Sequence, residues 1–141
     1  MESKIIDYLQ KNKVLTLATA VDNVPYCANC FYVFDERGKT LIFLSDNNTR
    51  HIREALLNKN VGGTVQNGVT TVAKIQGVQF TGEIVNPDSD QEKNFYKTYY
   101  KKFPFAKTKP SPIWGIRLNW VKMTDNTLGF GKKLVWSSNA S

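Results

Sequence analysis

VLTLATAVDNVPYCANCFYVFDERGKTLIFLS, residues 14–45, decides the fold class. Its apolar residues recur at every second position in three runs that are rich in β-branched and aromatic side chains, which is typical of strands. The segments between the runs have turn composition, and DERGK has the Asp-then-Gly pattern of a hairpin loop. The strands are expected over residues 14–21, 26–34 and 40–45. This stretch therefore predicts antiparallel strands joined by hairpins.

The rest of the chain adds strands between three amphipathic segments. Apolar spacing predicts helices over residues 2–12, from the polar residues 46–48 to about residue 57, and over 88–103. Ser3 is the expected cap of the first helix. Further strands are expected over residues 61–66, 71–85, 112–122 and 132–136. Asn67-Gly68 is a strong hairpin signal between two of them.

Six or seven strands with hairpin signals between most of them predict a mainly antiparallel sheet. Closing such a sheet into a barrel, with a few helices packed outside, removes its exposed edges. The length of 141 residues suits one domain, and neither an internal repeat nor a linker interrupts it. We therefore expect a single mainly β domain over residues 1–141, with a closed or nearly closed barrel.

The amino-acid composition is that of a globular domain and gives no sign of a membrane helix. Hydrophobic residues make up 41% and charged residues 22%, as in an ordinary globular domain. The longest apolar runs span a few residues, whereas a membrane helix needs about 20. The first residues, MESKIIDYLQKN, lack the apolar core of a signal peptide. The sequence predicts a cytoplasmic protein with no membrane partner.

The charge of the chain is uneven. Residues 1–92 carry 9 Lys and Arg against 11 Asp and Glu, whereas residues 93–141 carry 10 against one, Asp125. A basic half suits nucleic acid, an anionic membrane or a phosphate-bearing ligand, and it is equally typical of a solvated lysine-rich face. The aromatic residues between Tyr96 and Phe103 recur at helical spacing, which favours packing. We expect no nucleic-acid partner, because no recognition motif supports one.

The CANC segment, Cys27 to Cys30, raises the question of sulfur chemistry. Within a strand, Cys27 and Asn29 share one face and Cys30 faces the other way. Three residues of strand span about 10 Å, which is too far for a disulfide. These are the only cysteines, and His51 is the only histidine. The sequence therefore predicts two unpaired cysteines and no metal site.

FLSDNNTRHI, residues 43–52, is a candidate anion site. A strand ends there, polar residues follow, and a helix begins at Thr49-Arg50. A helix start offers free N–H groups and a partial positive charge, and a hydroxyl and a guanidinium would complete a phosphate site. The alternative is ordinary helix capping by Thr49, with Arg50 in solvent.

Two further segments carry weaker signals. In KIQGVQFTGEI, residues 74–84, the apolar pattern changes parity near Gly77, which predicts a β-bulge there and turns Gln79 away from the core. An irregular strand with a polar outer face explains the same pattern. TDNTLGFGKK, residues 124–133, has two glycines that permit a close ligand approach, or it is a plain glycine-rich hairpin.

Taken together, the runs FYVFD, TRH, GVQFTGEI and TDNTLGFGKK resemble the small YhbP-like proteins of the pyridoxamine-phosphate-oxidase-like superfamily, over nearly the whole chain. The resemblance implies an FMN-binding split barrel with six antiparallel strands, which forms a homodimer with flavin at the interface. It places the FMN phosphate at Thr49 and Arg50. The implied borders of the flavin ring are Asn29, Cys30, Phe31, Tyr32, Phe43, Leu44 and Ser45.

The resemblance also implies a polar contact from Gln79 to the flavin edge. Trp114, Asn126 and Lys132 are the candidates for contacts from the second subunit. The chain ends in KKLVWSSNAS and lacks the arginine-rich motif and the Leu-x-Pro terminus of the true oxidase. This departure argues against pyridoxamine phosphate as the substrate, and it affects the same region as the second-subunit contacts.

The expected function is a flavin-dependent oxidoreductase that acts on a small molecule. FMN would carry the electrons, and hydrogen bonds from Ser45 or Gln79 would stabilise the reduced ring. No side chain is assigned as an acid or base. A barrel that holds flavin or haem without turnover is the alternative from another class.

Overall fold

The computed structural model describes residues 1–139. The helices are α1 (Ser3–Lys11), α2 (Arg50–Leu57) and α3 (Ser89–Lys102), with the short 3-10 helices η1 (Val72–Lys74), η2 (Pro104–Thr108) and η3 (Asn126–Leu128). The strands are β1 (Val14–Val21), β2 (Val24–Asp35), β3 (Thr40–Leu44), β4 (Asn60–Gln66), β5 (Gln76–Val85), β6 (Ile113–Asp125) and β7 (Lys133–Ser137).

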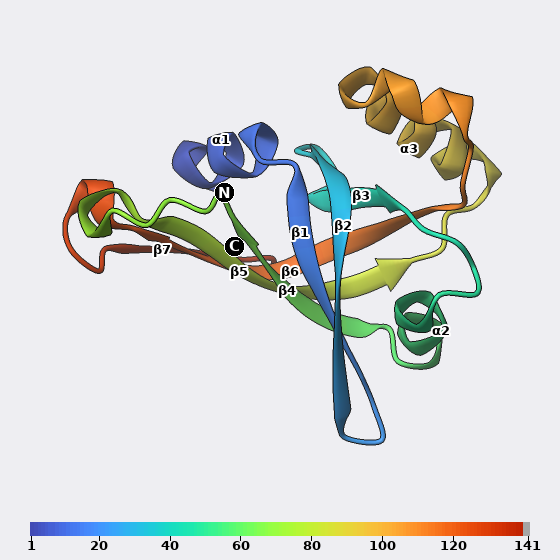
Figure 1. Cartoon of the computed structure of the whole chain (residues 1–141), viewed down its shortest axis with the longest axis horizontal. Coiled ribbons are helices and arrows are strands. Elements are labelled where there is room, and N and C mark those ends of the chain that lie inside the picture. Colours follow the sequence, from blue (N-terminus) through green and yellow to red (C-terminus); the bar gives the residue numbers. More distant parts are fainter. Residues whose placement is uncertain (140–141) are drawn as a thin grey trace.

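The sheet closes into a ring through β6. Its strand order is β3-β2-β1-β4-β5-β6-β7, every pairing is antiparallel, and β3 also pairs with the first half of β6. β7 pairs with the second half of the same strand, whose other edge still pairs with the first half of β5. The β6–β7 hairpin and the start of β5 therefore extend from the ring together, and we call this extension the β6–β7 arm (Figure 1). The expected six-stranded antiparallel barrel is confirmed, and β7 is a seventh strand outside the ring.

The core fills the ring because alternate residues of each strand point inward. Leu15, Leu17, Tyr32 and Phe43 are completely buried in this way. α1 and α2 press their apolar edges against the same core, which contains Ile5 and Leu9 from α1 and Ile52 and Ala55 from α2.

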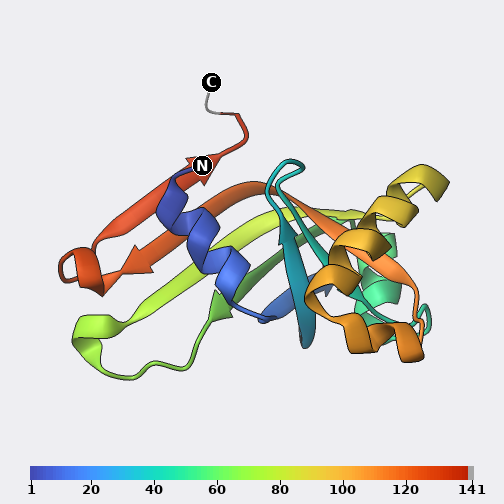
Figure 2. The ribbon, with the colours of Figure 1, turned by 90° about the horizontal axis from the view of Figure 1, so that it is seen from above.

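α3 lies outside the ring against the opposite faces of β2, β3 and β6 (Figure 2). Its inward residues, Phe95 and Tyr99, form a second apolar cluster with Val33, Ile42 and Ile113. Asp88 caps its start by accepting a hydrogen bond from the Gln91 amide at 2.9 Å. The predicted helix over residues 88–103 is therefore confirmed, and its aromatic residues pack as the spacing predicts.

The predicted bulge near Gly77 is wrong. The register between β5 and β6 shifts at Thr81/Gly82, where Thr81 pairs with Trp120 and Gly82 pairs with Leu118. Asn119 of β6 is thus the extra residue, and its side chain accepts a hydrogen bond from Thr81 Oγ1 at 2.5 Å. The bulge changes the parity of β6, so Trp120 does not continue the inward face that Leu118 occupies.

The predicted strand over residues 71–85 begins five residues later than expected. η1 occupies residues 72–74 and β5 starts at Gln76, so a long loop joins β4 to β5 instead of a tight turn at Asn67-Gly68. The physical reason lies in a tertiary contact. The Asn126 amide group donates to the Val72 carbonyl at 2.8 Å and its backbone N–H donates to the Ile75 carbonyl at 2.9 Å.

Ser3 is not the cap of α1. Glu2 occupies the capping position, and no side chain accepts a hydrogen bond there. Among residues 1–139, no helix has both the length and the apolar character that crossing a bilayer would require.

Candidate functional site

The corner between β3 and α2 gathers polar side chains at one point. The Thr49 hydroxyl accepts a hydrogen bond from the Ile52 amide at 3.4 Å and donates to the Asp46 carbonyl at 2.9 Å. The Ser45 amide donates to the Pro112 carbonyl at 3.0 Å. Thr49 is therefore the N-cap of α2, which is the alternative to a phosphate contact that the sequence leaves open, and the corner is fixed to the start of β6.

Ser45, Thr49 and His51 meet within this corner. The Ser45 Oγ lies 2.6 Å from His51 Nε2, and the Thr49 Oγ1 lies 3.4 Å from the same nitrogen. Burial lowers the pKa of His51, which favours its neutral form. Two hydroxyls and an imidazole thus converge beside the first turn of a helix, whose N–H groups have no partners within the helix. The Thr49 hydroxyl already donates to Asp46, and the Ile52 N–H already donates to Thr49. The donors left for an anion are the remaining N–H groups of the first turn and the Ser45–His51 pair.

Sequence reasoning missed His51 in this group. A lone histidine has no partner that can be read from the chain, because its contact to Ser45 depends on the turn between them. The signal that was present is its place directly after the capping pair in the run TRH.

The Arg50 guanidinium points elsewhere. Its Nε donates to Glu54 Oε2 at 2.7 Å, and its Cζ lies 4.2 Å from the centre of the Tyr26 ring. Glu54 also accepts a hydrogen bond from the buried Thr19 hydroxyl at 2.8 Å. The hydrogen bonds from Arg50 and then Thr19 lower the pKa of Glu54. Arg50 is therefore tied to β1 and β2 in this structure, and a ligand would have to draw it away from Glu54.

Asn29 and Gln79 face the same outer surface of the sheet. The register places Asn29 beside Thr16, Thr16 beside Thr64, and Thr64 beside Gln79, so these four residues form one row across β2, β1, β4 and β5. The Thr16 hydroxyl donates to Asn29 Oδ1 at 2.9 Å. We call this set the polar row. It confirms that Gln79 faces away from the core.

Two open cavities lie along the polar row. One of ≈ 530 Å³ contains Asn29, Thr16 and Thr64, with Lys11 and Lys13 at its side. The other, of ≈ 370 Å³, contains Thr64 and Gln79. Both volumes are in the range of small-molecule sites. The row therefore offers polar contacts and two positive charges to a planar anionic ligand.

Other candidates on β2 and β3 have their side chains in the core. Cys30, Tyr32 and Phe43 are buried, and the Tyr32 hydroxyl donates to the Leu9 carbonyl at 2.7 Å. These three residues could border a ligand only through backbone atoms. Phe31 is 60% exposed, and its ring meets that of Phe103 edge-on at 5.9 Å. Leu44 is half-buried.

The three second-subunit candidates lie at two different places. Trp114 is buried in the β3–α2 corner, where its Nε1 donates to the Ser45 carbonyl at 2.9 Å. Asn126 accepts a hydrogen bond from the Gly131 amide at 2.9 Å in the loop at the tip of the β6–β7 arm, and Lys132 is exposed in the same loop. Trp114 is thus hydrogen-bonded within the β3–α2 corner of its own subunit, whereas Asn126 and Lys132 lie on the projecting arm.

The two cysteines differ in exposure, as the strand pattern predicts. Cys27 is exposed, Cys30 is buried, and both are free. Burial raises the pKa of Cys30 to about 11, so its thiol stays protonated at pH 8.

We expect iodoacetamide to alkylate Cys27 alone in the native protein and both cysteines in urea, as intact mass would show. Native Cys27→Ser should gain no adduct, and an adduct in that variant would contradict this packing of β2.

The chain matches no protein-family model. It is 43% identical over 129 residues to the UPF0306 protein YhbP of Salmonella paratyphi A, and the match covers 92% of this chain and 88% of that protein. The chain belongs to the UPF0306 family. The YhbP-like resemblance of its sequence is thereby confirmed.

Solved structures of other proteins share the fold of this UPF0306 chain. A heme binding protein from Mycobacterium smegmatis superposes with a TM-score of 0.74 at 16% identity, over 89% of this chain and 53% of that one. This chain spans about half the length of that protein. A FAD-binding protein from Mesorhizobium loti superposes with a TM-score of 0.71 at 19% identity, over 87% of this chain and 94% of that one. The split-barrel fold is thus confirmed.

Proposed function

We propose that this UPF0306 protein binds FMN and is a flavin-dependent oxidoreductase. The observation that carries the proposal is the convergence of Ser45, Thr49 and His51 at the start of α2. Hydroxyl, imidazole and helix N–H groups are the donors that a phosphate monoester prefers. The fold adds support, since its structural neighbours include a FAD-binding and a heme binding protein.

The residues present fit a phosphorylated flavin. In the proposal the β3–α2 corner holds the phosphate, and the polar row holds the ring on a surface of short side chains. Ser45, which the resemblance assigns to the ring, belongs to the phosphate site here because its hydroxyl lies 2.6 Å from His51 Nε2. FMN would supply the electron chemistry when bound. Gln79 and Asn29 would orient the pyrimidine edge by hydrogen bonds, and Lys11 and Lys13 would favour an anionic ring electrostatically.

The proposal includes two copies of the chain, with the flavin between them. Its support is the position of Asn126 and Lys132 on the β6–β7 arm. This arm and the β3–α2 corner lie at opposite ends of the same subunit, with the barrel between them (Figure 1). A second copy would bring such an arm to the polar row. We also place the protein in the cytoplasm, which suits two free cysteines.

Arg50→Ala tests the phosphate site. We expect this variant to bind FMN about tenfold more weakly, the loss of one charge-assisted contact after Arg50 leaves Glu54. Fluorescence titration of flavin-free protein measures the dissociation constant. Arg53→Ala is the matched control, because Arg53 is exposed on the same helix. An Arg50→Ala variant with wild-type affinity would show that the guanidinium does not reach the phosphate.

Binding without turnover is the second candidate function, and the heme binding neighbour favours it. Anaerobic incubation of the FMN complex with NADPH separates the two. Bleaching of the flavin absorbance by NADPH supports the oxidoreductase. A flavin absorbance that NADPH leaves unchanged supports a carrier.

A further inference from the structure

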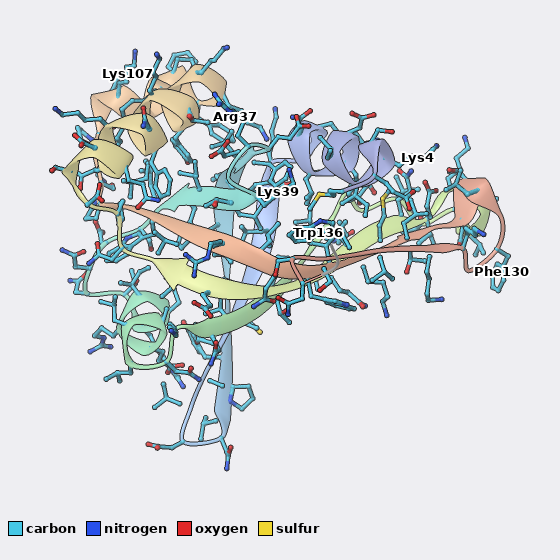
Figure 3. All side chains as sticks on the ribbon, turned by 180° about the vertical axis from the view of Figure 1, so that it is seen from behind. Lys4, Arg37, Lys39, Lys107, Phe130 and Trp136 are labelled. Atoms are coloured by element: carbon cyan, nitrogen blue, oxygen red, sulfur yellow. The ribbon has the colours of Figure 1, made fainter. Side chains whose placement is uncertain are left out.

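Five lysines form an outward surface on α3 and the segment that follows it. Lys93, Lys97 and Lys101 are four residues apart, so they lie along one stripe of the helix, while Phe95 and Tyr99 face the barrel. Lys107 lies in η2, and Lys109 follows η2. All five side chains are exposed. We call Lys93, Lys97, Lys101, Lys107 and Lys109 the lysine surface. Figure 3 shows Lys107 at the outer edge of this region, far from Lys4.

The lysine surface forms no ion pair in the described part of the chain, and the nearest carboxylates along α3, Asp90 and Glu92, lie in its first turn. Residues 93–109 contain six lysines and no Asp or Glu. The sixth, Lys102, turns inward and donates to the Gln10 and Asn12 carbonyls at 3.1 and 2.6 Å. Within residues 1–139, the ion pairs of the chain involve Arg50, Lys59 and Arg117 and none of these lysines. The surface is therefore complementary to a partner with many negative charges.

One large apolar side chain is exposed within the same segment of the chain. Phe105 is 87% exposed in η2, between Lys101 and Lys107 in the sequence. A cavity of ≈ 550 Å³ is lined by Lys97, Tyr100, Lys101 and Lys107 of the lysine-rich segment. An exposed aromatic ring among lysines is the arrangement of a segment that lies in the interface of a bilayer, with its ring among the acyl chains and its ammonium groups at the headgroups.

The aromatic contacts of the region favour a lipid surface over single-stranded nucleic acid. Single-stranded nucleic acid stacks successive bases on several aromatic side chains, whereas Phe105 is the one exposed aromatic residue within residues 93–109. The Tyr96 and Tyr100 rings already stack on each other, with centroids 5.4 Å apart, and Lys107 Nζ lies 5.8 Å from the centre of the Tyr100 ring. The surface also has no arginine, which is the usual residue for bidentate phosphate recognition in nucleic acids. Lysines act as point charges, which suffices for a charged membrane.

We propose that the lysine surface and Phe105 bind the headgroups of an anionic phospholipid bilayer, with the barrel held at its surface. The sequence predicts no membrane partner because no segment can span a bilayer, but contact from one side needs no such segment. The polar row and the β3–α2 corner take no part. This inference is therefore independent of the flavin proposal.

Co-sedimentation with vesicles tests the inference. We expect the full chain to bind vesicles of phosphatidylglycerol and phosphatidylcholine and to stay in solution with vesicles of phosphatidylcholine alone. The variant K97Q/K101Q/K107Q should bind the anionic vesicles about 100-fold more weakly, roughly fivefold for each lysine. Phe105→Ser should weaken binding about tenfold at unchanged net charge, through loss of one buried aromatic ring.

The matched control is K4Q/K74Q/K133Q, which removes the same charge from exposed lysines of other elements. Its binding should stay within about threefold of the wild type, because attraction falls off within a Debye length of the bilayer. Equal losses in the two triple variants would reduce the effect to net charge and overturn the inference. So would equal binding to both kinds of vesicle, no binding to either, or displacement of the protein from vesicles by a stoichiometric single-stranded RNA.

Discussion

Asp125→Ala lowers the free energy of unfolding by about 3 kcal/mol, because it removes a buried carboxylate that several donors share. Asp125 is 0% exposed at the end of β6. It accepts hydrogen bonds from the Thr127 amide at 2.9 Å, from the Thr127 hydroxyl at 2.5 Å and from Gln76 Nε2 at 3.2 Å. Alanine would leave these donors unpaired, and water cannot easily replace the carboxylate in a buried position.

The pKa of Asp125 fits this interpretation. Burial alone would raise it, but the hydrogen bonds from Thr127 and Gln76 outweigh burial and hold the pKa below its usual range. A carboxyl group whose pKa is lower in the folded state stabilises the fold above its unfolded pKa, near 3.9, and the stabilisation is lost as the pH falls. The effect of Asp125→Ala is therefore fully present at pH 7.

Urea unfolding at pH 7 measures the change in the free energy of unfolding, and two further variants serve as comparisons. Asp125→Asn keeps one acceptor oxygen in the same shape, so it should lose less stability than the alanine variant. Asp7→Ala removes an equal charge from the exposed face of α1 and should stay within about 0.5 kcal/mol of the wild type. An Asp125→Ala variant as stable as Asp7→Ala would mean that the arm does not depend on this carboxylate.

The alternation of apolar and polar residues within short segments predicts most of the strands, because a strand's two faces are set by residues that are close together in the sequence. β1 begins and ends at the predicted residues, and α3 differs by one residue at each end. The barrel itself required the further argument that exposed edges must be removed, and the pairing of β3 with β6 closes the ring as expected, while β7 stays outside it as an edge strand. These features depend on residues that lie close together in the chain or on a general physical constraint.

The bulge and the β4–β5 loop could not be predicted, because both depend on partners far away in the sequence. The position of Asn119 as the extra residue follows from how β6 aligns with β5. The β-branched residues Thr71 and Val72 have strand composition, but hydrogen bonds from Asn126 hold the chain in a 3-10 turn there. Local composition favours one structure, and a long-range contact selects another.

The residues of the candidate site also fall into those that the sequence predicts and those that only the structure shows. Capping by Thr49 is one of the two alternatives that the sequence leaves open. The outward face of Gln79 is predicted correctly, although the bulge near Gly77 from which it is inferred is wrong. The tie between Arg50 and Glu54 is an i,i+4 pair that the run RHIRE contains, yet only the structure shows the guanidinium directed away from the corner. His51 could not be assigned, since its partner Ser45 reaches it across a turn.

The second large effect is discrimination between FMN and riboflavin. The two ligands share the ring and ribityl chain and differ only in the phosphate. If the corner of Ser45, Thr49 and His51 holds that phosphate, FMN gains several hydrogen bonds to a charged group, each worth about 1.5–3 kcal/mol. Even after partial loss to desolvation, we expect FMN to bind at least about 100-fold more tightly.

A double variant locates this discrimination. Ser45→Ala with Thr49→Gly removes both hydroxyls while glycine keeps most of the helix-capping function. It should weaken FMN binding and leave riboflavin binding unchanged, because riboflavin has no group at that point. A variant that weakens both ligands equally would place the ring, and not the phosphate, at the corner.

The ratio of the riboflavin and FMN dissociation constants, measured by titration of the same flavin-free protein at pH 7, tests most directly whether this barrel holds a phosphorylated flavin. A ratio of about 100 or more is the expected result. Equal constants, or no saturable binding of FMN, would contradict it.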